Sequence, residues 1–85
     1  MRIALIAHDS RKELMAQFCT AYLRILSEND LVATGVTGKI VHDATGLPVR
    51  CLYPGGRGGA EQIAAMIGCG EIYMLLFFRD PVSAK

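Results

Sequence analysis

The stretch Arg2-Ile3-Ala4-Leu5-Ile6-Ala7 decides the fold class, because after its first residue it is apolar without any alternation of polar and apolar positions. A strand with one face in water alternates, whereas a strand covered on both faces reads as a continuous apolar run. Strands of the second kind belong to parallel sheets with helices packed on their faces. The stretch therefore predicts an α/β domain.

A helix is expected directly after this strand. Ser10 would open the helix, and Glu13 has the spacing of a capping box relative to it. The side chains expected on the buried face of this helix are Leu14, Phe18, Tyr22 and Leu26, with Met15 and Cys19 beside them. They recur every four residues, which is typical of an amphipathic helix.

Strand-like and helical segments alternate along the rest of the chain. We expect strands over 31–34, 49–53 and 72–78, a short helix over 38–44 that Gly46 closes, and a helix from Ala60 that Gly68 and Gly70 end. This order predicts a three-layer α/β/α domain with a parallel sheet of about four strands. The whole chain, residues 1–85, is expected to form one domain.

Composition and charge exclude several classes of protein. The chain has 52% hydrophobic and 20% charged residues, which is typical of a packed core and not of a disordered segment. Its net charge is +1 with no basic block, which argues against a nucleic-acid partner. Its longest apolar run, 72–78, is far shorter than the roughly 18 residues of a membrane span. The apolar run at the N-terminus is too short for a signal peptide, so we expect a cytoplasmic protein.

The cysteines indicate neither a disulfide framework nor a zinc site. Cys19, Cys51 and Cys69 are odd in number and form no C-x-x-C pair. We expect three buried thiols in a reducing compartment, and no metal ligands.

The carboxyl ends of parallel strands lie at one edge of the sheet, where ligands bind. The segments expected there are 8–9, 34–38, 54–59 and 79–81, and Lys12 could point back over the same edge. Segment 34–38 is either an anion cradle at a helix N-terminus or an ordinary capped turn. It lacks the spacing of a P-loop, and segment 54–59 lacks that of a dinucleotide-binding loop.

Single residues at this edge have two interpretations each. His8 ends a buried strand where sites form, so a functional role and a structural one are equally supported by its position. Asp9 either balances the helix dipole or orients His8 or a ligand. Asp80, before Pro81, is either a turn former or a carboxylate of the site. Arg57 is either a solvated surface residue or a ligand of an anion. His42 falls inside the expected helix over 38–44 and is interpreted as a surface residue or a modest core contact.

Five ordered segments together resemble methylglyoxal synthase over nearly the whole chain. They are 3–9 with Lys12, Ala33-Thr34-Gly35-Val36-Thr37-Gly38, Ala44-Thr45-Gly46, Pro54-Gly55-Gly56-Arg57-Gly58-Gly59 and Phe77-Phe78-Arg79-Asp80-Pro81. The resemblance implies a cytoplasmic homo-oligomeric lyase that converts dihydroxyacetone phosphate to methylglyoxal and phosphate without a metal or organic cofactor. The residues that it implies for binding the substrate phosphate, or inorganic phosphate, are Lys12, Thr34, Thr37, Gly38 and Gly55. It implies that His8 and Asp9 lie in the active site.

The sequence departs from the family pattern at three places. The catalytic aspartate that ends the family's glycine loop is replaced by Ala60, with Glu61 one place along as a makeshift base. One of the family's phosphate-binding threonines is Val36. The chain stops at Lys85, before the segment in which the family carries a further histidine and aspartate, so we expect the domain to be incomplete at its C-terminus.

Three hypotheses follow for this chain. It is a methylglyoxal synthase, or it is a catalytically silent module of the same fold that binds phosphate or a phosphorylated metabolite. In the third hypothesis it is a structural remnant that is stable only as an oligomer, because a shortened sheet exposes an apolar strand edge.

Overall fold

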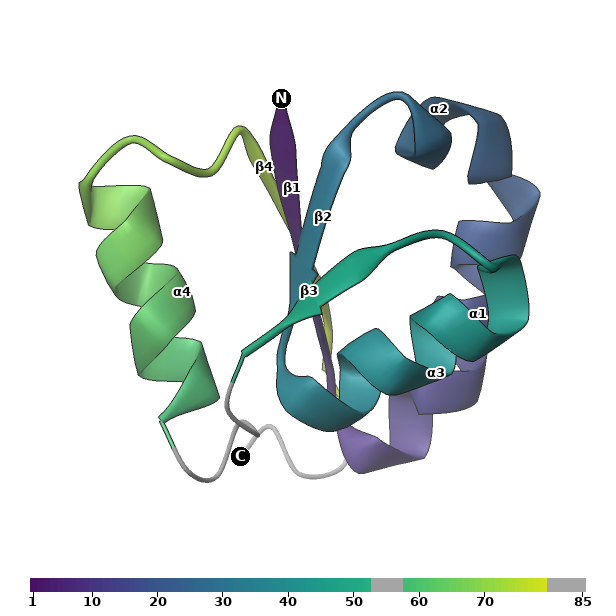
Figure 1. The fold of residues 1–85 in the computed structure, drawn as a ribbon. Coiled ribbons are helices and arrows are strands. Elements are labelled where there is room, and N and C mark those ends of the chain that lie inside the picture. Colours follow the sequence, from purple (N-terminus) through teal and green to yellow (C-terminus); the bar gives the residue numbers. More distant parts are fainter. Residues whose placement is uncertain (53–57, 80–85) are drawn as a thin grey trace.

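A parallel sheet forms the centre of the computed structural model, which describes residues 1–52 and 58–79 (Figure 1). Within these residues the strands are β1 (Arg2–Ala7), β2 (Asp30–Ala33), β3 (Val49–Cys51) and β4 (Met74–Phe78), in the order β3-β2-β1-β4. All three neighbouring pairs are parallel. The helices are α1 (Lys12–Ala21), α2 (Leu23–Ser27), α3 (Gly35–Thr45) and α4 (Gly59–Gly68), and a 3-10 turn spans Asp9–Arg11.

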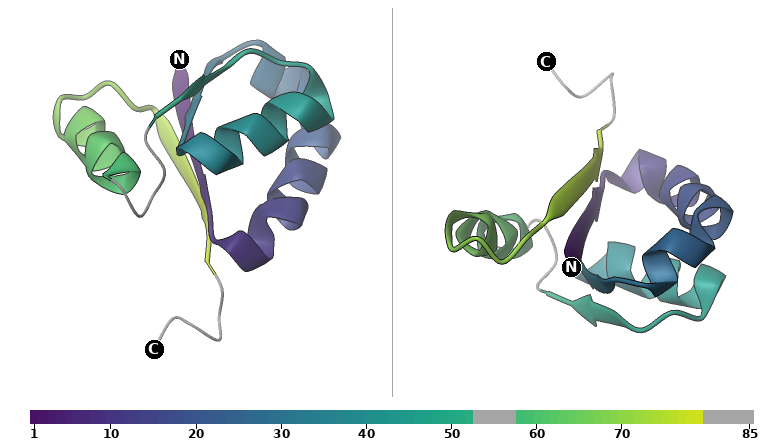
Figure 2. Two further views of the ribbon diagram at one scale, coloured as in Figure 1. Left: turned by 60° about the horizontal axis from the view of Figure 1, so that its bottom comes forward. Right: turned by 90° about the horizontal axis from the view of Figure 1, so that it is seen from above.

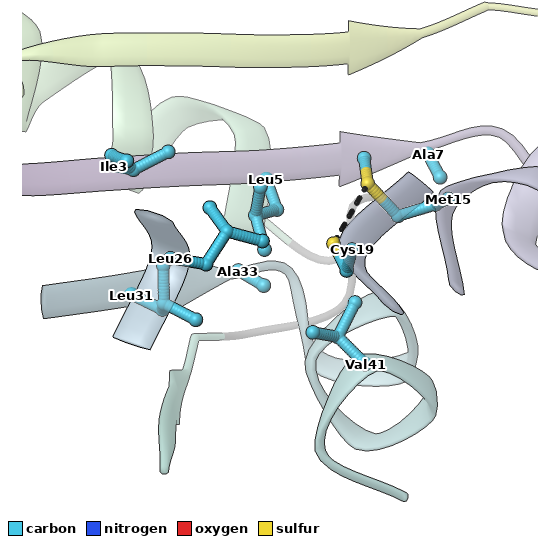
Figure 3. Packing of buried hydrophobic residues seen from close by; sticks show 9 residues of the cluster. All are labelled: Ile3, Leu5, Ala7, Met15, Cys19, Leu26, Leu31, Ala33 and Val41. Carbon is cyan, nitrogen blue, oxygen red and sulfur yellow. Dashed lines mark hydrogen bonds between the residues drawn. The ribbon is translucent and has the colours of Figure 1, made fainter. Parts of the chain in front are cut away.

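The helices lie on both faces of the sheet, so the expected α/β/α layering is confirmed. Figure 2 shows α4 on one face and α1 and α3 on the other. The larger core lies between the sheet, α1, α2 and α3 (Figure 3), and its members are Ile3, Leu5, Ala7, Met15, Cys19, Leu26, Leu31, Ala33 and Val41. On the opposite face a smaller cluster of Ala4, Val32 and Ile63 joins the sheet to α4. The central strand β1 contributes to both clusters, as its uninterrupted apolar sequence predicted.

The first helix differs from the expectation in how it begins and in which side it buries. His8 caps the 3-10 turn by accepting a hydrogen bond from the Ser10 N–H, so the capping-box prediction for Ser10 was wrong. The predicted buried stripe was also wrong in part, since Leu14 is 48% exposed and Tyr22 is 50% exposed. Met15 and Cys19 are the residues of α1 that are buried.

The packing around α1 explains this rotation of the buried face. Helix α1 packs against both the sheet and α3, and Met15 and Cys19 face that corner. Phe18 contacts Tyr22 and also Phe78 of β4, with ring centroids 4.6 and 5.5 Å apart. Phe18 therefore packs on β4, the strand at the edge of the sheet, and Tyr22 beside it is only partly covered.

The single first helix that was expected is divided at Tyr22 into α1 and α2. The remaining elements agree with the expectations apart from their ends. Helix α3 begins at Gly35, three residues earlier than expected, and ends at Thr45, where the next residue, Gly46, has a left-handed φ of +76°. Helix α4 runs over Gly59–Gly68, close to its expected limits. The expectation of three buried thiols was wrong, because Cys51 and Cys69 are exposed and only Cys19 is buried. No helix in residues 1–52 and 58–79 is long and apolar enough to cross a membrane.

Burial gives Cys19 a measurable effect on stability at alkaline pH. It raises the pKa of the Cys19 thiol from 9.0 to about 11. The native state therefore keeps this proton to a higher pH than the unfolded state does. The contribution of Cys19 to the free energy of unfolding is full below pH 9 and is lost as the pH rises toward 11. We expect the Cys19 contribution to the free energy of unfolding to fall by about 1 kcal/mol per pH unit in this window. Urea unfolding of wild type and Cys19→Ala from pH 8 to 11 measures it, and equal slopes for the two proteins would contradict the assignment.

Candidate functional site

His8 lies where β1 leaves the sheet, at the edge formed by the carboxyl ends of the strands. Its N–H donates to the Phe78 carbonyl over 2.9 Å, which fixes its backbone between the ends of β1 and β4. Its side chain is exposed, and the Nδ1 atom lies 3.3 Å from the Ser10 hydroxyl. The Ser10 N–H donates to the same Nδ1 over 3.4 Å, so this nitrogen is the one without a proton in that contact.

Lys12 bends back over the same edge, as the sequence predicted. It is the first residue of α1, and its ammonium donates to the Ala7 carbonyl over 2.7 Å. It also forms an ion pair of 3.1 Å with Asp9. The Lys12 side chain is only 14% exposed, whereas that of Asp9 is 94% exposed. The positive charge is therefore fixed at the end of β1, while the carboxylate that balances it lies in solvent, where screening makes the pair weak.

Thr34 and Thr37 bring two buried hydroxyl groups to the same place. Thr34 precedes α3 with extended backbone angles, and its hydroxyl donates to the Thr37 hydroxyl over 3.3 Å. The Thr37 hydroxyl donates to the Ala7 carbonyl over 3.5 Å. Lys12 and Thr37 thus share one acceptor, although 25 positions separate them in the sequence.

The first turn of α3 adds main-chain donors beside these side chains. Thr34 makes no side-chain cap, so the N–H groups at the start of the helix are not satisfied by its hydroxyl. An 11-residue helix places partial positive charge at this end. Val36, at the position where a threonine was expected from the resemblance, is exposed on this turn. The combination of a fixed ammonium, two hydroxyls and a helix N-terminus suits a small oxyanion such as a phosphate group.

Gly38 has a packing role in this turn. Its N–H donates to the Thr34 carbonyl over 2.8 Å and is therefore used by the helix itself. A Cβ atom at this position would lie 2.6 Å from Cys51 Sγ and 3.4 Å from the Ala33 Cβ. The absence of a side chain lets the start of α3 approach the ends of β2 and β3.

Gly38→Ala tests that close approach. We expect it to lower the free energy of unfolding by about 1 kcal/mol, because overpacking against Cys51 outweighs the better helix propensity of alanine. In a Cys51→Ala background the same change should raise the free energy of unfolding by up to about 1 kcal/mol. Chemical denaturation of the four proteins of this double-mutant cycle provides the comparison. An effect of the same sign in both backgrounds would show that the contact with Cys51 is not what requires glycine.

The remaining residues proposed for the site lie apart from this cluster or outside the description. Gly55 falls in 53–57 and Asp80 in 80–85, which the structure does not describe, and the same holds for Arg57. Glu61 is exposed in the first turn of α4, and its Oε2 atom would lie 3.9 Å from a Cβ placed on Gly58. Its side chain therefore folds back along the start of the helix.

Two features of the site were not predicted from the sequence. The Ala7 carbonyl is the common acceptor, and a main-chain group carries no signal in the residue type. The exposed side chain of Cys51 packs at the start of α3. Nothing in the sequence around Cys51 indicated this contact. His42, for which a surface position and a modest core contact were both open, is exposed, and its Nδ1 lies 2.7 Å from the Leu47 carbonyl oxygen. No group of three His, Cys, Asp or Glu side chains within residues 1–52 and 58–79 could hold a metal ion.

Comparison with known proteins gives consistent matches along the chain, although no protein-family model matches it. The chain is 52% identical over all 85 residues to methylglyoxal synthase of Caldicellulosiruptor saccharolyticus. It is 48% identical to that of Bacillus subtilis, again over its whole length. The chain is homologous to methylglyoxal synthases. It spans 60% of the first relative's length and 62% of the second's.

The solved structure of a methylglyoxal synthase has the same fold. The enzyme from Elizabethkingia anophelis NUHP1 superposes with a TM-score of 0.93 at 34% identity, over 99% of this chain and 55% of that one. The resemblance based on the five sequence segments is thereby confirmed, and so is the predicted fold class. The strands and helices described above correspond to a part of the methylglyoxal synthase domain.

Proposed function

We propose that this chain binds the phosphate group of dihydroxyacetone phosphate at the carboxyl edge of its sheet and takes part in converting it to methylglyoxal and phosphate. The observation that carries the proposal is the convergence of Lys12 and Thr37 on the Ala7 carbonyl beside the uncapped start of α3. The homology to methylglyoxal synthases supports the choice of substrate.

The proposed phosphate site uses groups that are already held in place. The Lys12 ammonium has three N–H donors and directs one at Ala7 and one at Asp9, so it can direct the third at a phosphate oxygen. Thr34 and Thr37 can turn their hydroxyls from one another toward the ligand. Because these side chains are largely buried, little rotational freedom is lost on binding.

The proposed reaction begins with removal of a proton from the hydroxymethyl carbon next to the carbonyl. The electron pair forms a carbon–carbon double bond and the carbonyl oxygen becomes the oxyanion of an enediolate. When the hydroxyl on the deprotonated carbon loses its proton, the bond between the neighbouring carbon and the phosphate oxygen breaks. Phosphate leaves with the electron pair of that bond. The enol that remains tautomerises to methylglyoxal.

Three residues are proposed to serve these steps. His8, at the carboxyl edge of the sheet, is proposed to donate a hydrogen bond to the oxyanion as it develops. Asp9 is a carboxylate at the same edge, and Glu61 is the carboxylate nearest in sequence to the position of the family's general base. We propose that the protein works without a cofactor, as a homo-oligomer in the cytoplasm.

A second candidate function is favoured by Ala60. An alanine at the position of the general base leaves a phosphate site without the group that removes the proton. In that case the chain is a module that binds phosphate or a phosphorylated metabolite and does not turn it over.

An assay of methylglyoxal formation, run beside calorimetric titration with inorganic phosphate, separates the two functions. Phosphate binding together with turnover above buffer supports the synthase. Binding without turnover supports the silent module and rejects catalysis by this chain. If phosphate does not bind, both functions are wrong, because both depend on the cluster around Ala7.

A further inference from the structure

A pocket of about 510 Å³ lies at the amino ends of β1, β2 and β3, on the edge of the sheet away from the proposed phosphate site. Its volume falls in the range of about 300–1,000 Å³ that is usual for small-molecule sites. All of its lining residues belong to the segment 2–50. In Figure 1 the start of β1 lies at the top and the start of α3 at the bottom, so the two regions are at opposite ends of the sheet.

The pocket combines apolar walls with a few polar side chains. Its walls come from the first residues of β2 and β3. The polar residues of its lining are Arg2, Asn29, Asp30 and Arg50. In binding sites of this composition the apolar walls bury the ligand, and the few polar groups fix its orientation.

Asp30 and Arg50 lie on the same face of the sheet. Val32 belongs to the cluster under α4, and its side of the sheet is shared by Asp30, two residues earlier, and by Arg50, its partner on β3. Neighbouring strands are about 4.8 Å apart and two residues of a strand span about 6.6 Å, so the two Cα atoms are about 8 Å apart. The two side chains therefore reach over a common part of the pocket.

These two opposite charges do not neutralise each other. Within the residues that the structure describes, neither Asp30 nor Arg50 forms an ion pair, and both are exposed. Arg2, the partner of Asp30 on β1, directs its Nη1 atom to Glu71 Oε1 over 3.1 Å instead. The Asp30 carboxylate and the Arg50 guanidinium can therefore both meet the charges of a ligand.

We propose that this pocket binds a free amino acid with an apolar side chain. Arg50 holds the α-carboxylate with the paired N–H groups of its guanidinium, and Asp30 accepts hydrogen bonds from the α-ammonium. Asn29, whose Nδ2 donates to the Ile25 carbonyl over 2.8 Å, adds an amide beside Asp30. The side chain of the amino acid lies against the apolar walls.

A zwitterion suits this pocket better than an anion or a cation alone. An anion on Arg50 would be repelled by the Asp30 carboxylate, and a cation on Asp30 would be repelled by the guanidinium. The adjacent charges of an amino acid satisfy both residues at once. Inorganic phosphate has no cationic group and is not expected to bind at this edge. The inference does not depend on the proposed function, because it uses no residue of the phosphate site.

Titration of the ¹⁵N-labelled chain with L-leucine, followed by two-dimensional NMR, tests the proposal. We expect saturable shifts of the Asp30 and Arg50 amides, with a dissociation constant of about 1 mM or lower, and none at Gly35 or Thr37. The matched controls are 4-methylpentanoate, which lacks the ammonium, and 3-methylbutylamine, which lacks the carboxylate. Each should bind at least about 10-fold more weakly than leucine, because one charged hydrogen-bonding group is lost.

Two results of this titration would overturn the proposal. The first is the absence of shifts at Asp30 and Arg50 up to about 10 mM leucine, well above the expected dissociation constant. The second is equal binding of leucine and either control compound, because the pocket would then recognise a single charge.

Variants that remove one charge test the assignment of the two residues. Asp30→Asn and Arg50→Gln should each raise the dissociation constant for leucine at least about 10-fold. Asp43→Asn and Arg24→Gln make the same changes at exposed positions of α3 and α2, and should change it less than twofold. Equal effects of the pocket variants and their controls, or full binding by Asp30→Asn and Arg50→Gln, would overturn the assignment.

Discussion

Replacing Ala60 with aspartate is expected to raise the rate of methylglyoxal formation by about 10²–10⁴-fold, which is the usual contribution of a positioned general base. Ala60 is the second residue of α4. By the sequence resemblance, it stands at the position of the catalytic aspartate of methylglyoxal synthases. Glu61 can replace that base only poorly, because α4 already begins at Gly59 and one step along a helix turns the side chain by about 100°.

Two control variants make this result specific. Ala64→Asp adds the same charge one turn later, at another exposed alanine of α4, and should leave the rate unchanged. Glu61→Gln removes the makeshift base and should reduce the rate of the wild-type chain but not that of Ala60→Asp. If Ala60→Asp binds phosphate like wild type and gains no activity, the synthase function is wrong for this chain.

Removal of the Lys12 charge should have the second large effect. Lys12→Met keeps most of the aliphatic side chain and removes the ammonium that lies on the Ala7 carbonyl. A hydrogen bond to a charged group contributes about 1.5–3 kcal/mol. We therefore expect the dissociation constant for inorganic phosphate to rise by about 10- to 150-fold, measured by calorimetric titration.

Lys39→Met is the matched control for Lys12→Met. Lys39 lies on α3 itself, is 75% exposed and pairs with Asp43 across one turn. Its removal changes the net charge by the same amount and should change the phosphate dissociation constant less than twofold. Equal losses in the two variants would mean that phosphate responds to overall charge and not to the site.

The apolar stretch of β1 predicted the class of the fold, because a continuous apolar run is typical of a central strand in a parallel sheet that helices cover on both faces. It could not predict which face of α1 is buried. That choice depends on α3, which packs against α1 and draws Met15 and Cys19 inward while Leu14 stays partly exposed. Spacing along one helix does not contain this information, since several faces of an apolar helix satisfy the same period.

The site was predictable as a set of loops and not as a set of contacts. Strand order placed His8, Lys12 and Thr34 at one edge, and the structure brings Lys12 and Thr37 to one carbonyl there. Which atom they share depends on where β1 ends relative to α3. Whether these residues bind phosphate stays a prediction, as does the contribution of Gly55.

The most direct test of the phosphate site is titration of the ¹⁵N-labelled chain with inorganic phosphate, followed by two-dimensional NMR. The account predicts saturable shifts of the amides of Gly35, Val36 and Thr37 at the start of α3, and none at Asn29 and Asp30 at the opposite edge of the sheet. Amides at the start of α3 that do not move, or shifts of equal size at both edges, would contradict it.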